Sequence, residues 1–145
     1  MIEYGEYSFA YLISIHPRFA DLIYEGKKTI ELRRKFNPKF EHEIVYFYET
    51  APVKKITGWA YVEIGDYVTV GSITPELLDE MCISEDEFIN YIGDSQGRML
   101  HLGGAQRFPI PMDLSDAWNR RPPQSWKYFY YSRFVDVDEL LTDHF

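Results

Sequence analysis

The chain has 145 residues, of which 46% are hydrophobic, and a chain of that length can bury a core without disulfides or metals. Cys82 is its single cysteine, which excludes an internal disulfide, and no apolar run approaches the roughly 18 residues of a membrane-spanning helix. The net charge of −8 argues against a general binder of nucleic-acid duplexes, because such proteins are usually basic. We therefore expect one soluble, cytoplasmic domain over residues 1–145 that does not contact a membrane.

The charges are unevenly distributed along the chain. Residues 27–55 carry eight Lys or Arg and four Glu, whereas residues 58–96 carry nine Asp or Glu and no Lys or Arg. A basic stretch of this kind can attract an anion while the acidic remainder keeps the protein soluble. A single strand of RNA or a single nucleotide therefore suits the chain better than a long duplex.

The first predicted elements are a strand and a short helix. Residues 9–15 are apolar and β-prone, which predicts a strand after a loose start. Pro17 suits the first turn of a helix over residues 17–25, and Gly26 suits the position just after its end. The helix has an apolar face formed by Phe19, Leu22 and Ile23.

Residues 29–35 alternate in polarity, which predicts a second strand. Ile30 and Leu32 point to one face, and the other face carries polar side chains, namely Thr29, Glu31, Arg33 and Lys35. Opposite charges about 6–7 Å apart along a strand can hold a polar ligand. They can equally form a surface ion pair on a solvated strand face. The pattern leaves both interpretations open.

Two further strands are predicted over residues 43–49 and 54–64. The first has apolar residues on both of its faces, which indicates that both are covered. The second contains Gly58, and a lone glycine within a strand often marks a bulge or a close approach of the backbone. Residues 67–70 can extend the sheet.

The second half of the chain begins with two helical segments. Thr74 precedes one of them, and Ser84 with Glu87 forms a capping box for the other, so the acidic residues here are explained by helix starts. Strands are then predicted over residues 98–102, stopped by Gly103-Gly104, and over the proline-containing residues 107–114. Residues 126–135 are β-prone, and residues 137–145 predict a final short helix.

A short motif in the first half of the chain resembles a known family. Gly26, Lys28, Glu31 and Arg33 fill the pattern G-x-K-x-x-E-x-R, which is similar to that of the ASCH domain, a member of the PUA-like superfamily of small β-barrels. The flanking stretches that share the resemblance are residues 13–17, 52–58 and 122–126. The resemblance implies an α+β fold: a PUA-like mixed, mainly antiparallel β-barrel of five to six strands with short flanking helices.

The resemblance also implies RNA-related roles in transcription, RNA processing or translation control. Our first interpretation is a non-enzymatic module that binds single-stranded RNA or a nucleotide. Its predicted ligand-binding residues are Lys28, Glu31, Arg33, Tyr48, Lys54, Gln124 and Ser125. Cationic side chains would contact phosphate or a carbonyl oxygen, and the Gln124 amide would bind a base edge. Tyr48 and Trp59 are candidates for stacking on a base, with core packing as the alternative for each.

The alternative is a small hydrolase that acts on an acylated cytidine or, as a metal-dependent ribonuclease, on RNA. Lys28 would be catalytic together with Glu31 or Glu63, and the alternative for Glu63 is a solvated strand end. In amidohydrolase-like members the lysine of the motif is catalytic and a Thr stands where this chain has Glu31, so Lys28 matches and Glu31 departs. No cofactor and no metal site are predicted, and a divalent metal enters only with the ribonuclease alternative. A structural interaction module is a third interpretation, and the sequence carries no signal for the oligomeric state.

Overall fold

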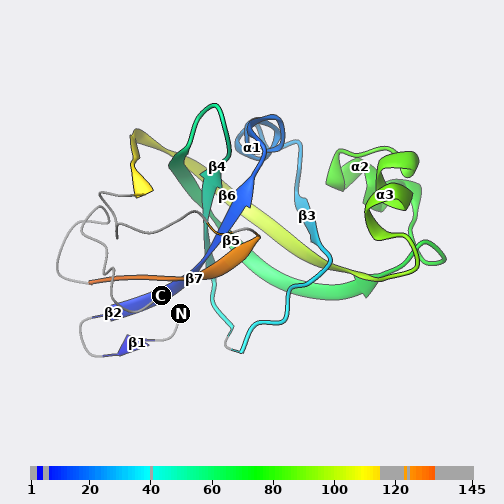
Figure 1. The fold of residues 1–145 in the computed structure, drawn as a ribbon, viewed down its shortest axis with the longest axis horizontal. Helices are drawn as coiled ribbons and strands as arrows, with labels where there is room; N and C mark the ends of the chain where they lie inside the picture. Colours follow the sequence, from blue (N-terminus) through cyan, green and yellow to red (C-terminus); the bar gives the residue numbers. More distant parts are fainter. Residues whose placement is uncertain (1–2, 5–6, 40, 115–122, 124, 133–145) are drawn as a thin grey trace.

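One curled sheet forms the body of the protein in this computed structural model, which describes residues 3–4, 7–39, 41–114, 123 and 125–132 (Figure 1). Its strands are β1 (Glu3–Tyr4), β2 (Tyr7–Ile15), β3 (Ile30–Arg33), β4 (Ile44–Glu49), β5 (Lys55–Val68), β6 (Gly97–Met112) and β7 (Trp126–Ser132). They follow the order β1-β2-β4-β5-β6-β3, and β7 also pairs with β2.

The pairing confirms the predicted class, an α+β fold with a mixed, mainly antiparallel sheet that curls into a half-barrel. β2 and β4 run parallel, and the other pairs are antiparallel. Within the described residues the sheet has seven strands, one more than the upper end of the predicted five to six. The two-residue β1 lies where a loose start was expected.

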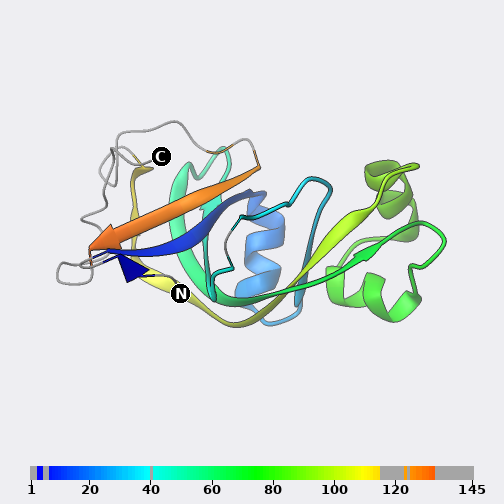
Figure 2. The ribbon, with the colours of Figure 1, turned by 90° about the horizontal axis from the view of Figure 1, so that it is seen from below.

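Short helices lie in two places beside the sheet. Figure 2 shows α1 (Pro17–Tyr24) against the curve of the sheet, with α2 (Pro75–Met81) and α3 (Glu85–Ile92) together at one end. The predicted helix starts are confirmed, because Pro17 occupies the first turn of α1, Thr74 caps α2, and Ser84 forms a capping box with Glu87.

Apolar side chains cover both faces of β4, as the sequence predicts. Val45 and Phe47 pack in a core cluster that also includes Ile23 of α1. Tyr46 and Tyr48 face the other way and pack in a second cluster. A third cluster joins β3 to α2 and α3, and its buried members are Ile30, Leu32, Val68, Met81, Phe88 and Ile92. The helical pair is thus attached to the sheet through β3.

Gly58 lies at a β-bulge and at a point where neighbouring elements approach the backbone of β5 closely. The register between β4 and β5 shifts beside it, and so does the register between β5 and β6. A Cβ at this position would lie 2.2 Å from the Gln106 carbonyl oxygen and 2.6 Å from the Tyr24 hydroxyl. Only glycine lets α1 and β6 pack this closely to β5.

The prediction of two separate strands over residues 98–102 and 107–114 was wrong. The structure has a single strand, β6, of 16 residues. Gly103-Gly104 does not stop it, because Gly104 takes a positive φ of 60° and the register with β5 shifts at this point. The glycine pair therefore bends the strand as a bulge. The continuous strand pairs with both β5 and β3.

The predicted helix over residues 137–145 lies outside the described residues. Among the helices that the structure describes, none is long and apolar enough to cross a membrane.

Candidate functional site

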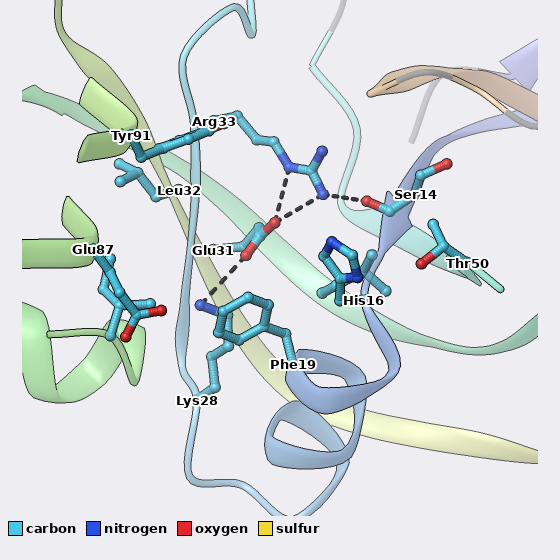
Figure 3. A pocket seen from close by; sticks show the side chains of 12 residues that line it. Ser14, His16, Phe19, Lys28, Glu31, Leu32, Arg33, Thr50, Glu87 and Tyr91 are labelled. Carbon is cyan, nitrogen blue, oxygen red and sulfur yellow. Dashed lines mark hydrogen bonds and ion pairs between the residues drawn. The ribbon is translucent and has the colours of Figure 1, made fainter. Parts of the chain in front are cut away.

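A pocket of about 410 Å³ opens between α1, β3 and α3 (Figure 3). One wall comes from α1 and the ends of β2 and β4, and the opposite wall comes from α3 and the residues before it. Its lining residues are Ser14, Ile15, His16, Phe19, Lys28, Glu31, Leu32, Arg33, Thr50, Ile83, Glu87 and Tyr91.

The local sequence places three charged side chains on this pocket. Gly26 takes a φ of 79° after α1 and turns the chain toward β3. Along β3 the alternation sends Ile30 into the third core cluster and leaves Glu31 and Arg33 on the pocket side. Lys28, Glu31 and Arg33 are 3%, 7% and 9% exposed. The interpretation as a solvated strand face was wrong, and the three side chains do line one cleft.

Lys28 is held by polar partners from α2 and β3. Its Nζ donates to the Met81 carbonyl oxygen at 2.6 Å and lies 3.3 Å from Glu31 Oε1. The same atom lies 4.8 Å from the centroid of the Phe19 ring, at cation–π distance. An ammonium carries three N–H groups, so two partners among the described residues leave one donor for a ligand.

Arg33 is fully engaged by the protein itself. Its Nε donates to Glu31 Oε2 at 2.9 Å, and its Nη2 lies 2.8 Å from the same oxygen. Nη2 also donates to the Ser14 carbonyl oxygen, and Nη1 donates to Ser125 Oγ at 3.2 Å and to the Ser125 carbonyl oxygen at 3.3 Å. The guanidinium thus joins β3 to β2 and to the beginning of β7. We call this arrangement the Arg33 clasp.

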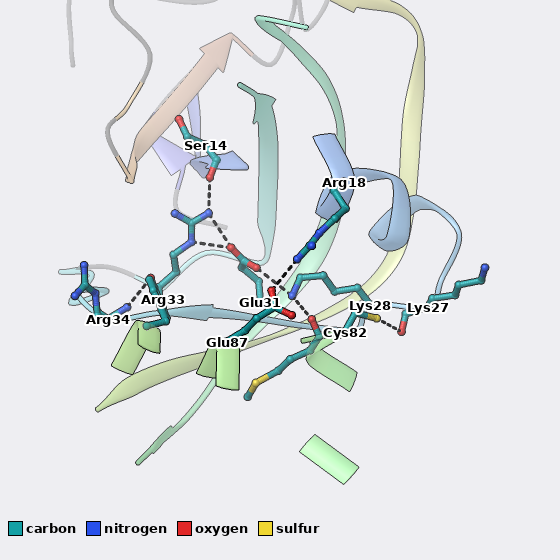
Figure 4. Close-up of polar contacts among 11 residues, drawn as sticks. Ser14, Arg18, Lys27, Lys28, Glu31, Arg33, Arg34, Cys82 and Glu87 are labelled. Carbon is teal, nitrogen blue, oxygen red and sulfur yellow. Dashed lines mark hydrogen bonds and ion pairs between the residues drawn. The ribbon is translucent and has the colours of Figure 1, made fainter. Parts of the chain in front are cut away.

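Glu31 connects the two cations, as Figure 4 shows. One carboxylate oxygen faces Lys28 and the other faces Arg33. A buried carboxylate is costly unless it is paired and hydrogen-bonded, and here Oε1 is paired with Lys28 while Oε2 accepts from Arg33. The result is a fixed polar wall with two positive charges and one negative charge.

A second ion pair lies at the rim of the pocket. Arg18 Nη2, on α1, lies 3.0 Å from Glu87 Oε2, on α3. The pKa of Glu87 is below its usual value, chiefly because the Ser84 backbone N–H donates to the carboxylate and also because Arg18 does. Glu87 therefore serves two elements, since it caps α3 and binds the arginine of α1.

The sequence analysis did not assign roles to several residues that line the pocket. Thr50 Oγ1 is buried and has no hydrogen-bond partner within the described part of the chain, so a ligand can satisfy it. Phe19 and Tyr91 bring aromatic rings, and His16 lies at the start of α1. Ser14 and His16 fall in the stretch 13–17 that carried the family resemblance, which was the one available signal for them.

The other predicted site residues either lie away from the pocket lining or fall outside the described residues. Tyr48 packs in the second core cluster, where burial raises the pKa of its hydroxyl. Lys54 is exposed on the turn after β4, and Ser125 supports Arg33. Gln124 lies outside the described residues. Trp59 packs on the second core cluster, and Glu63 is exposed on β5.

The pocket does not offer an evident set of metal ligands. Glu31 is held by two cations, and Glu87 is held by Arg18 and the Ser84 backbone. Across the described residues there is no group of three or more His, Cys, Asp or Glu placed to hold a metal ion. The expectation that the protein carries no resident metal stays a prediction.

Comparisons with known proteins point in one direction. The ASCH domain family model matches residues 13–92. A protein of Zymomonas mobilis described as an ASCH domain-containing ribonuclease is 30% identical in an alignment of 118 residues that covers 79% of this chain and 80% of that protein. The crystal structure of ASCH from Zymomonas mobilis has a TM-score of 0.72 at 30% identity and covers 81% of this chain and 85% of that one. A structure of a variant of ASCH from that organism, with a tyrosine replaced by phenylalanine, has a TM-score of 0.71 at 29% identity, with coverage of 81% and 88%.

Proposed function

Because the chain belongs to the ASCH domain family, we propose that it binds RNA and holds one nucleotide of a single strand in the pocket between α1, β3 and α3. The observation that carries the proposal is the buried Lys28–Glu31 pair beside the Phe19 ring. A base edge needs donors and acceptors, and a base plane needs an apolar surface. The pocket wall supplies polar groups and an apolar surface side by side, because the Phe19 ring lies beside the Lys28–Glu31 pair.

Each chemical requirement has a candidate residue. Lys28 offers its remaining N–H to a carbonyl oxygen or ring nitrogen, and Glu31 can accept from an amino group. Thr50 Oγ1 can donate or accept at the opposite wall. Phe19 and Tyr91 can stack on a base. A volume of about 410 Å³ lies within the range of small-ligand sites.

Lys54 supports a contact outside the pocket. It is exposed on the turn that Thr50 begins, and Thr50 lines the pocket. A strand with one nucleotide in the pocket would bring a neighbouring phosphate toward this turn, where a lysine can neutralise it. Ser125 contributes indirectly by fixing Arg33, and Gln124 remains a proposed reader of a base edge.

The test is equilibrium binding of a fluorescein-labelled, mixed-sequence RNA hexamer at low salt. Lys28→Met keeps the aliphatic stem and removes the charge, so we expect the affinity to fall roughly tenfold. Lys27→Met is the matched control, because Lys27 is exposed and its ion pair with Glu25 lies outside the pocket. Equal affinity of the native protein and Lys28→Met would contradict the proposed site, and no binding by the native protein would contradict the function.

Hydrolysis of RNA or of an acylated cytidine is the second candidate function, and the relative described as a ribonuclease favours RNA as the substrate. In this case Lys28 and Glu31 act on a bound phosphodiester or modified base. Arginine stays protonated, so Lys28→Arg removes any proton transfer by the lysine. Glu31→Gln removes the carboxylate.

The two candidates are separated by a product assay. The native protein and both variants are incubated with short RNAs and with acylated cytidines, in Mg²⁺ and in EDTA. Product from the native protein that disappears in both variants, while hexamer binding persists, would support the hydrolase. Binding without product from any substrate would support the module.

A further inference from the structure

Arg18 is the cation most available to a ligand at this pocket. Its side chain is 62% exposed, and its guanidinium carbon lies 4.3 Å from the centroid of the Phe19 ring. Stacking on the Phe19 ring holds the planar guanidinium of Arg18 beside the pocket. Of its five N–H groups, the structure engages only those of Nη2, in the contact with Glu87 within the described residues.

Arg33 provides the contrast. Each of its three nitrogens already donates to Glu31, Ser14 or Ser125. A phosphate could bind Arg33 only by breaking the Arg33 clasp, which would leave buried acceptors without partners. Arg33, the arginine of the sequence motif, is therefore structural, whereas Arg18 keeps donors for a ligand beside its exposed pair with Glu87.

The Glu87 carboxylate occupies the position at Arg18 where the anion of a ligand would bind. Its carboxylate lines the pocket, accepts from Arg18 through one oxygen and caps α3 through the other. Figure 4 shows the ends of Arg18, Glu87 and Lys28 gathered in the same region. The Arg18–Glu87 pair is exposed, and such pairs contribute little to stability, so exchanging its anion costs little.

We propose that Arg18 binds a phosphate of the nucleotide held in the pocket, and that Glu87 occupies its guanidinium until the ligand displaces the carboxylate. This inference rests on the proposed RNA binding. It assigns a phosphate-binding residue outside the family motif and a competing carboxylate within the same pocket. It also narrows the ligand class to phosphate-bearing nucleotides, because a free nucleoside gives Arg18 no anion in exchange for Glu87.

The experiment is a double-mutant cycle on hexamer binding. Arg18→Gln should weaken binding about tenfold, because a charge-assisted phosphate contact is lost. Glu87→Gln should tighten binding about fivefold, because glutamine keeps the capping box and removes the competing charge. In the double variant the gain should vanish, since Glu87 acts through Arg18.

Matched controls make the same charge changes elsewhere. Lys27→Gln removes an exposed cation, and Glu85→Gln removes a carboxylate from the first turn of the same helix. Both should change affinity less than twofold. Competition with cytidine monophosphate and with cytidine gives a second readout, because Arg18→Gln should erase the preference for the phosphorylated competitor.

The outcomes distinguish the inference about Arg18 from the proposed RNA binding on which it rests. If the native protein binds the hexamer but Arg18→Gln behaves like Lys27→Gln, the inference is overturned and RNA binding stands. A gain in Glu87→Gln that persists without Arg18 also overturns it, because the effect is then general electrostatics. If the native protein does not bind RNA at low salt, both proposals are overturned.

Discussion

The three charged residues of the motif differ in what they can do, although the sequence presents them as equivalent. Arg33 donates to a carboxylate, to Ser14 of β2 and to Ser125 just before β7, so it holds the pocket together. Lys28 keeps a donor for a ligand while it is anchored to Met81 and Glu31. The division follows from hydrogen-bond accounting, because a donor that is used by the protein cannot serve a ligand.

Replacement of Arg33 by lysine tests its structural role. Lysine keeps the charge but cannot reach three acceptor groups with a planar fork, so we expect a loss of roughly 3 kcal/mol in the free energy of unfolding. Urea denaturation followed by fluorescence measures it. Arg34→Lys is the control, since the adjacent Arg34 is exposed and should change stability little. Similar midpoints for the two variants would refute the clasp.

The buried His42 should make the free energy of unfolding depend on pH. Burial lowers the pKa of His42 from 6.5 to about 4. Below pH 6.5 the unfolded chain takes up a proton that the folded protein excludes, so the stability present above pH 6.5 is lost progressively toward pH 4. The loss amounts to at most about 3 kcal/mol.

Urea denaturation between pH 7 and 4 checks this expectation. His42→Phe keeps an aromatic ring against Tyr11 and removes the titration, so its pH profile should be flatter. His101→Phe alters an exposed histidine and should keep the slope of the native protein. Parallel profiles for the native protein and His42→Phe would show that other groups cause the acid sensitivity.

Residues that meet across long sequence separations escaped prediction. Alternation over residues 29–35 was enough to place Glu31 and Arg33 on one face, because neighbours along a strand have a fixed geometry. Lys28 lies before β3 and was grouped with them by the family motif. Arg18 and Glu87 are 69 residues apart and meet only because α1 and α3 flank β3. In the sequence Thr50 is an ordinary turn residue, and only the folded structure shows that it lines the pocket.

At the scale of elements, Gly58 and Gly103 make a matched pair of glycines. A Cβ at Gly58 would collide with the backbone oxygen of Gln106, whereas a Cβ at Gly103 would meet nothing within 4 Å. Gly58→Ala should therefore lower the free energy of unfolding by about 3 kcal/mol, the upper part of the usual range for overpacking. Gly103→Ala should be nearly neutral. Equal stability of the two variants in urea would mean that β5 and β6 separate readily at Gly58.

The glycine pair in β6 shows why element boundaries were harder to predict than element types. Glycine permits both a chain stop and a bulge, and local sequence cannot separate the two. Pairing decides the matter, because β5 continues on both sides of Gly104 and keeps β6 extended. The capping box at Ser84 carried no such ambiguity, since its two hydrogen bonds are local.

At the scale of the whole molecule, the net charge of −8 limits how nucleic acid can bind. Few phosphates can be contacted at once, so the affinity for an RNA hexamer should fall only moderately with salt. A plot of log affinity against log salt concentration should have a slope of about −1.5 to −3. Lys54→Ala should reduce the slope by about 0.7. A duplex of the same sequence should compete poorly. A slope near zero, or stronger competition by the duplex, would contradict the proposed binding mode.

The Arg33 clasp also sets the order in which the site can be completed during synthesis. Arg33 and Ser125 are 92 residues apart, and β3 pairs with β6 from the second half of the chain. A ribosome releases the chain from its N-terminal side at roughly 5–20 residues per second, so β3 waits several seconds for its partners. A nascent chain that has not yet exposed Ser125 lacks the Arg33 clasp and therefore has no finished pocket.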